Sequence, residues 1–138
     1  MSTHTDMQVE FSLHAFSCNP KEITQALGVT PTSIWSEGDP IPPSKIRRKS
    51  NGWSLRSSAA PDFPDLEAHV RWLLSHFPLG LEPLQQVCER WYAELSVVVN
   101  LRDGAPALHL PADLLGELAG IGASVDIDLY IRRFEPSA

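Results

Sequence analysis

The sequence predicts an α+β fold in which a mostly antiparallel sheet carries helices packed on one face. Segments with the alternating apolar period of half-buried strands lie near both ends of the chain. Segments with helical spacing of apolar residues lie between them. The order strand, helix, strand occurs near the start and again near the end, so we expect two related strand-helix-strand halves within one fold.

The first strand and the first helix are expected at residues 7–15 and directly after Asn19. Apolar and polar side chains alternate through 7–15, as in a strand with one buried face. Asn19, Pro20 and Glu22 then match the start of a helix, with a capping side chain, a proline in the first turn and a glutamate that can return a hydrogen bond. Gly28 is suited to end this short helix.

A proline-rich bend and a basic hairpin are expected in the next part of the chain. After an extended segment at 33–35, the prolines between positions 40 and 43 lack the backbone donors that a central strand needs. Asn51 and Gly52 both tolerate positive φ, which predicts a two-residue turn within a hairpin at 44–57. That register places Arg47 opposite Arg56, with Lys49 on the same side.

The rest of the chain predicts helices and strands in turn. Helices show apolar residues at three- and four-residue spacing, and strands show the period of two. The expected elements are helices at 65–77 and 82–91, a strand at 93–101 in a central position, a short strand at 108–110, a helix at 111–121 ended by Gly122, and a half-exposed strand at 124–132.

Length and composition fit one domain over residues 1–138, with flexible ends at 1–5 and 134–138. The 138 residues are 43% apolar, enough for a core of their own. Apolar runs fall far short of the roughly 20 residues that cross a bilayer, and the first residues lack an export signal. We therefore expect a cytoplasmic protein without membrane contact, with Cys18 and Cys88 as free thiols.

The charge of −6 is unevenly distributed along the chain. Residues 45–56 carry a charge of +5, whereas residues 1–44 carry −4 and residues 57–138 carry −7. General nucleic-acid binding requires a broad basic face, because affinity grows with the number of phosphates that are neutralised. The sequence therefore argues against it, and leaves open a local anion site or a basic protein partner for the acidic surface.

Several short motifs together resemble a known bacterial family. They are Gly38-Asp39-Pro40, Arg47-Arg48-Lys49, Gly52-Trp53-Ser54-Leu55 with Trp35 before them, Trp72-Leu73-Leu74, and the closing Gly122-Ala123 with Asp126, Asp128 and Tyr130. The chain resembles the family catalogued as domain of unknown function 4279 (DUF4279) over nearly its full length. That resemblance implies no catalytic set, so it transfers no functional residues.

The basic residues of the expected hairpin have three interpretations. Arg47, Lys49 and Arg56 would form a solvated face balanced by carboxylates such as Asp39, a surface for a protein partner, or a pocket for phosphate or carboxylate. Like charges opposed across a hairpin are unfavourable, so the arrangement requires solvent, acidic neighbours or a bound anion.

The tryptophans and two aspartates give further candidates, each with a structural alternative. Trp35 and Trp53 could cradle a base or sugar, or they could belong to the core. Asp126 and Asp128 lie on one face of a strand, where they could serve acid–base chemistry or bind a divalent cation. Arg132 or the basic hairpin could instead neutralise them.

The sequence contains no recognised catalytic, metal or cofactor motif. His69 and His76 are two helical turns apart, about 10 Å along the axis, which is too far to share one metal ion. We assign no catalytic residue, no metal ligand and no cofactor. An enzyme is therefore disfavoured.

Our leading hypothesis is a non-enzymatic cytoplasmic binding protein, and its narrower form is an immunity-like protein that neutralises a toxin or another protein partner. The alternative is a domain that binds a small molecule or phosphate anion through the cationic hairpin, and the third is a hydrolase centred on Asp126 and Asp128. Dimerisation of the chain through an edge strand is left open. The candidate ligand- or partner-binding residues are Trp35, Asp39, Arg47, Lys49, Trp53, Arg56, Asp126 and Asp128.

Overall fold

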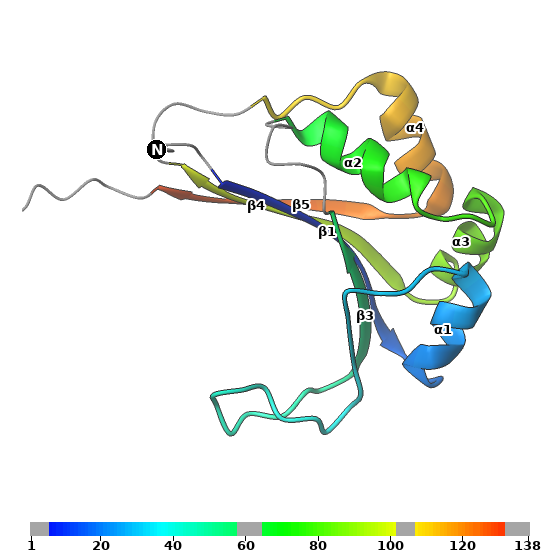
Figure 1. The fold of residues 1–138 in the computed structure, drawn as a ribbon, viewed down its shortest axis with the longest axis vertical. Coiled ribbons are helices and arrows are strands. Elements are labelled where there is room, and N and C mark those ends of the chain that lie inside the picture. The colour runs from blue at the N-terminus through cyan, green and yellow to red at the C-terminus, as the bar shows by residue number, and fades with distance from the viewer. Residues whose placement is uncertain (1–5, 58–64, 102–106, 132–138) are drawn as a thin grey trace, which may run out of the picture.

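The computed structural model describes residues 6–57, 65–101 and 107–131, which form an α+β fold (Figure 1). Expectations for residues 1–5, 134–138 and Arg132 lie outside this range. The elements, in chain order, are β1 (Asp6–Phe16), α1 (Pro20–Leu27), β2 (Ser33–Trp35), β3 (Asn51–Arg56), α2 (Leu66–Ser75), α3 (Leu81–Cys88), β4 (Tyr92–Leu101), α4 (Ala112–Ile121) and β5 (Ser124–Ile131).

The strands form one sheet in the order β2-β3-β1-β4-β5. β1 pairs antiparallel with β3 and with β4, and β2 pairs antiparallel with β3. Among the described strands, only the β4–β5 pair is parallel, and α4 supplies the crossover that a parallel connection requires. The sheet is therefore mostly antiparallel, with β2 and β5 at its edges.

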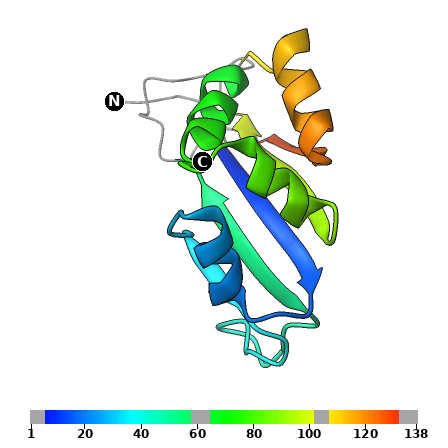
Figure 2. The ribbon, with the colours of Figure 1, turned by 90° about the vertical axis from the view of Figure 1, so that its right-hand side faces the viewer.

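The four helices cover one face of the sheet (Figures 1 and 2). Alternate residues of the strands point toward them, and helix residues at three- and four-residue spacing meet these strand residues. The fully buried side chains come from both layers: Val9, Phe11, Leu13, Ile23, Leu27, Trp53, Leu66, Val70, Leu73, Leu84, Leu95, Val97, Val99 and Leu114. We call the opposite side of the sheet the open face.

The two helices that were predicted to end at a glycine, α1 and α4, do so. In α1, the Asn19 side chain accepts a hydrogen bond from the Lys21 backbone N–H at 3.0 Å, and Glu22 accepts one from the Asn19 N–H at 3.1 Å. Gly28 ends the helix at φ 69°, and Gly122 ends α4 at φ 80°. These left-handed conformations favour glycine, which has no Cβ to clash.

The prediction of a hairpin turn at Asn51-Gly52 is wrong. Both residues lie inside β3, where Gly52 pairs with Trp35 on one side and with His14 on the other. Arg56 consequently faces Glu10 of β1, and the expected opposition of Arg47 and Arg56 does not exist.

The 36–50 loop contains a hairpin-like turn at a different place in the sequence. Its two arms are joined by hydrogen bonds from Gly38 N to Arg48 O, Arg48 N to Asp39 O and Ile41 N to Ile46 O, at 2.7–2.9 Å. The Pro42-Pro43 bond at its tip is cis. The proline segment is thus one arm of the turn, and the basic segment is the other. The loop projects beyond the end of β3 (Figure 1).

Two further expectations differ from the structure. Residues 108–110 form no strand. The two predicted strand-helix-strand halves, β1-α1-β2 and β4-α4-β5, are not arranged alike. The two strands of each half run parallel, but β3 lies between β1 and β2, whereas β4 and β5 are adjacent. The predicted central position of β4 is confirmed. Within the described ranges, no helix is long and apolar enough to cross a membrane.

Candidate functional site on the open face of the sheet

The open face gathers side chains from strands that are distant in sequence. Residues paired across neighbouring strands point to the same side of a sheet. The pairs Trp35–Gly52, Gly52–His14 and His14–Tyr92 therefore form one row across β2, β3, β1 and β4. We call Arg48, Trp35, His14 and Tyr92 the aromatic row.

Gly52 is required by the close approach of Trp35. A Cβ atom built on Gly52 would lie 1.9 Å from carbon atoms of the Trp35 indole, far inside van der Waals contact. The ring therefore lies directly over the backbone of β3 on the open face. Glycine at this position admits an aromatic side chain and does not form a turn.

The aromatic row continues from the loop to the centre of the sheet. The Arg48 guanidinium lies 4.4 Å from the centroid of the Trp35 ring, which is a cation–π geometry. The ring centroids of His14 and Trp35 are 6.0 Å apart, and those of His14 and Tyr92 are 6.1 Å apart.

Glu94 lies beside the aromatic row and is held by two hydroxyl groups. Tyr92 and Ser96 each donate a hydrogen bond to its carboxylate at 2.7 Å. These bonds lower the pKa of Glu94, and the bond to the carboxylate raises the pKa of Tyr92. Glu94 is therefore charged at neutral pH and fixes the orientation of Tyr92.

Asp126 and Asp128 extend the same face to the β5 edge. They pair with Ser96 and Val98 of β4, so they lie on the same side of the sheet as Tyr92 and Glu94. The negative charges of Asp128 and then Glu94, together with some desolvation, raise the pKa of Asp126. Across 6–57, 65–101 and 107–131, no three His, Cys, Asp or Glu side chains converge as metal ligands.

The basic residues predicted as anchors do not converge. Arg56 lies 3.4 Å from the Glu10 carboxylate, and Arg47 donates to the Gly38 carbonyl at 2.9 Å. Lys49 is exposed on the 36–50 loop. The physical reason is the register of β3, which directs Arg56 to the sheet and leaves Arg47 and Lys49 on the loop.

Two other candidates have local structural roles. Trp53 is fully buried on the helix-covered side, where its indole N–H donates to the Thr24 hydroxyl at 3.1 Å. The Asp39 carboxylate accepts from the Ser36 backbone N–H at 2.8 Å and so stabilises the turn that opens the loop. Of the two tryptophans, only Trp35 lies on the open face.

Sequence reasoning missed His14, Tyr92 and Glu94. His14 occupies a polar position of an alternating strand, and Glu94 lies opposite the apolar face of β4. Alternation could have assigned each of them to the outer face of its own strand. Only the pairing of β1 with β4 brings them together, and no local signal specifies that pairing.

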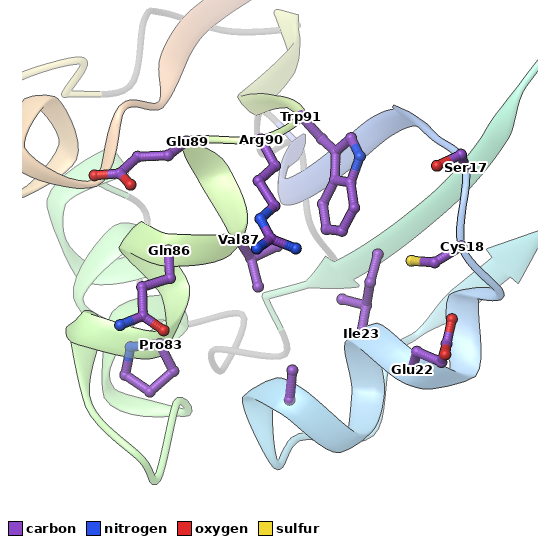
Figure 3. Close-up of a pocket in the computed structure, with 11 residues that line it drawn as sticks. Ser17, Cys18, Glu22, Ile23, Pro83, Gln86, Val87, Glu89, Arg90 and Trp91 are labelled. Carbon is purple, nitrogen blue, oxygen red and sulfur yellow. The ribbon is translucent and has the colours of Figure 1, made fainter.

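A separate cleft of about 650 Å³ lies between α1, α3 and the start of β4 (Figure 3). Figure 3 shows Arg90 and Trp91 projecting into it near Ile23 and Cys18. Burial, with Glu22 nearby, raises the pKa of the Cys18 thiol. Because a thiolate is the reactive form, this cysteine is not activated as a nucleophile.

Cys88 is also unsuited to reaction. Both cysteines are free thiols, and burial raises the pKa of Cys88 to about 12. Its thiol therefore stays protonated and packs as a small apolar side chain in the core.

Comparison with known proteins identifies the family. The model of the family described as domain of unknown function, DUF4279, matches residues 3–132, so the chain belongs to that family. No curated protein and no solved structure matches the chain.

Proposed function

We propose that this DUF4279 protein is a non-enzymatic binding protein that holds a protein partner against the open face of its sheet. One observation carries the proposal: in the described part of the chain, all helices lie on one side, and the other side presents side chains from all five strands. An antiparallel sheet can leave one face in solvent, so this face is accessible to another macromolecule.

The aromatic row supplies anchors of the type found at interface centres. Tryptophan, tyrosine and arginine are enriched in the residues that contribute most to protein–protein binding. Tyr92 is 49% exposed, and Arg48 covers one side of the Trp35 ring. The hydrogen bond from Tyr92 to Glu94 restrains the tyrosine before binding, which lowers the entropy cost of association.

The charges of the open face favour a partner with a basic surface. Glu94, Asp126 and Asp128 gather over β4 and β5, and Asp126 is destabilised in its charged form by the other two. A cationic group placed over these carboxylates would relieve that repulsion. Lys45, Arg47 and Lys49 lie on the loop at the other end, so the charge distribution would also orient the partner.

The narrower form of the proposal is an immunity-like role in the cytoplasm of a bacterium. An acidic surface accelerates capture of a basic protein by electrostatic steering. Several toxins act on nucleic acid, and such proteins carry basic surfaces for phosphate. The net charge of −6 and the acidic cluster on the open face support a target of this charge.

The two alternative functions, an anion-binding domain and a hydrolase, have less structural support. An anion pocket requires Arg47, Lys49 and Arg56 to point to one place, whereas Arg56 is directed to Glu10. A hydrolase requires Asp126 and Asp128 to act with other groups around a substrate, and both are exposed on the edge strand β5.

The test is affinity purification from the native host followed by native mass spectrometry. We expect a stoichiometric protein to accompany the wild-type chain and to dissociate at high salt. The double variant Asp126→Asn/Asp128→Asn should retain at least tenfold less of it. The matched control is Glu82→Gln/Glu117→Gln, which removes the same charge from exposed positions on α3 and α4.

Two results would contradict the proposal. One is the absence of any stoichiometric protein from the wild-type sample. The other is an equal loss in the aspartate variant and in the control, since that would attribute binding to net charge alone and not to the open face.

A further inference from the structure

The two edges of the sheet are protected to very different degrees. β2 has only three residues, and prolines at 31 and 40 stand on either side of it. Short length and neighbouring prolines are common ways to block the pairing of an edge strand with another chain. β5 has eight residues and contains no proline, lysine, arginine or glycine, so it has none of these protections.

β5 also exposes an apolar row. All eight of its residues are exposed. Val125, Ile127, Leu129 and Ile131 pair with core-facing residues of β4, so they point to the helix-covered side. Their exposed fractions nevertheless rise along the strand, from 39% and 41% to 54% and 77%. A long apolar edge strand of this kind aggregates unless a partner covers it.

We propose that β5 pairs antiparallel with β5 of a second copy across a twofold axis centred on Leu129, which joins the two sheets into one. A twofold axis perpendicular to the sheet keeps the apolar sides of both copies together, because directly paired residues point to the same side. This inference stands independently of the proposed function, since the pairing uses the strand edge and leaves the open face uncovered.

Charge and the length of strand that is paired together select the register. Centres at 126, 127 and 128 each place an aspartate opposite an aspartate, because Asp126 and Asp128 would then face themselves or each other. Like charges directly opposed destabilise an antiparallel pair. Centres at Val125, Leu129 and Tyr130 avoid this conflict. Of these, Leu129 pairs the longest part of β5, residues 127–131 of both copies, whereas the other two pair only three residues of each strand.

The contacts in this register are complementary on both sides of the sheet. On the helix-covered side, Leu129 meets the partner's Leu129, and Ile127 meets the partner's Ile131. On the open side, Asp128 lies opposite the partner's Tyr130, whose hydroxyl can donate to the carboxylate. Apolar groups therefore meet apolar groups, and Asp128 meets a hydrogen-bond donor.

Disulfide cross-linking tests the register directly. In a background of Cys18→Ser, which removes the more exposed native thiol, Leu129→Cys should give a covalent dimer on mild oxidation. Opposed α-carbons in an antiparallel pair are about 4.5–5.5 Å apart, within the range of about 4.4–6.8 Å for disulfides. Ile127→Cys should not cross-link to itself, because the two α-carbons would be about 13 Å apart at the rise of a strand. A mixture of Ile127→Cys and Ile131→Cys chains should cross-link.

Sedimentation velocity from about 1 µM to about 100 µM tests the interface without new thiols. The wild-type chain should be dimeric at the upper concentrations. Leu129→Lys should be monomeric with an unchanged circular dichroism spectrum, because two lysines would face each other at an exposed position. Ile46→Lys introduces the same charge at a residue that is 64% exposed on the loop, and it should stay dimeric.

Three outcomes would overturn the proposal. They are a wild-type chain that is monomeric throughout the series, a Leu129→Lys chain that dimerises like wild type, and efficient self-cross-linking of Ile127→Cys. The last would show that the copies pair in another register.

Discussion

On β1, Val9, Phe11 and Leu13 point into the helix-covered core, whereas Glu10 and His14 point to the open face. The covered side is held by burial of apolar area, which requires only that the side chains be apolar and fit together. The open side is organised by individual polar and aromatic contacts. The same strand thus contributes stability through one face and specific recognition chemistry through the other.

The largest loss of stability is expected from a substitution on the helix-covered side of the sheet. Trp53→Ala removes a fully buried indole and its hydrogen bond to Thr24. The free energy of unfolding should fall by about 3–5 kcal/mol, as for other large aromatic side chains in cores. Urea denaturation measures this change. A loss below about 1 kcal/mol would mean that the indole is not the tightly packed centre of this side.

Gly52→Ala tests how firmly the aromatic row is seated on the open face. The new methyl group would meet the Trp35 ring, so the ring must move, at a cost of about 1–3 kcal/mol in unfolding free energy. In a chain that already carries Trp35→Ala, the same substitution should cost little or should stabilise β3. Urea denaturation of both single variants and the double variant gives the coupling. Additive effects would rule out this contact.

The ion pair between Arg56 and Glu10 should contribute less to stability than the packing of Trp35 on Gly52. Both side chains are partly exposed, and the atoms are 3.4 Å apart. A double-mutant cycle with Arg56→Ala and Glu10→Ala should give a coupling of about 0.2–1 kcal/mol that decreases as salt is added. A salt-independent coupling above that range would indicate a more buried pair.

The smallest expected change in stability comes from the hydrogen bonds to Glu94, and it occurs only at acidic pH. Because hydrogen bonds from Tyr92 and Ser96 lower the pKa of Glu94 from its usual 4.5, the stability that they contribute is complete above that value. This contribution is lost as the pH falls through the folded-state pKa. Tyr92→Phe should raise the pKa of Glu94, as measured by NMR titration of its carboxyl group. An unchanged pKa would show that Ser96 alone holds the carboxylate.

The covered face was largely predictable from the sequence, because its signals are local. The alternation through β1 and the capping residues Asn19 and Glu22 each specify structure within a few positions. Gly122 was equally informative, since a left-handed residue directly follows the helix.

The open face was not predictable in the same way. Gly52 has the sequence signature of a tight turn, but its role depends on Trp35, a residue from another strand. His14 and Tyr92 lie far apart in the chain and meet only through the register of β1 with β4. Nothing within a short window of sequence encodes such a contact. The predicted basic hairpin failed for this reason, and with it the proposed convergence of its arginines.

The central position of β1 has a consequence for how the chain folds during synthesis. β1 is the first strand to be made, but its neighbours in the sheet are β3 and β4, and β4 begins only at Tyr92. At about 5–20 residues per second, translation takes several seconds to supply that second neighbour. Until then, β1 has an unpaired edge and the core around Val9, Phe11 and Leu13 lacks the β4 side chains, so nascent chains of this protein should depend on chaperones more than the mature fold would suggest.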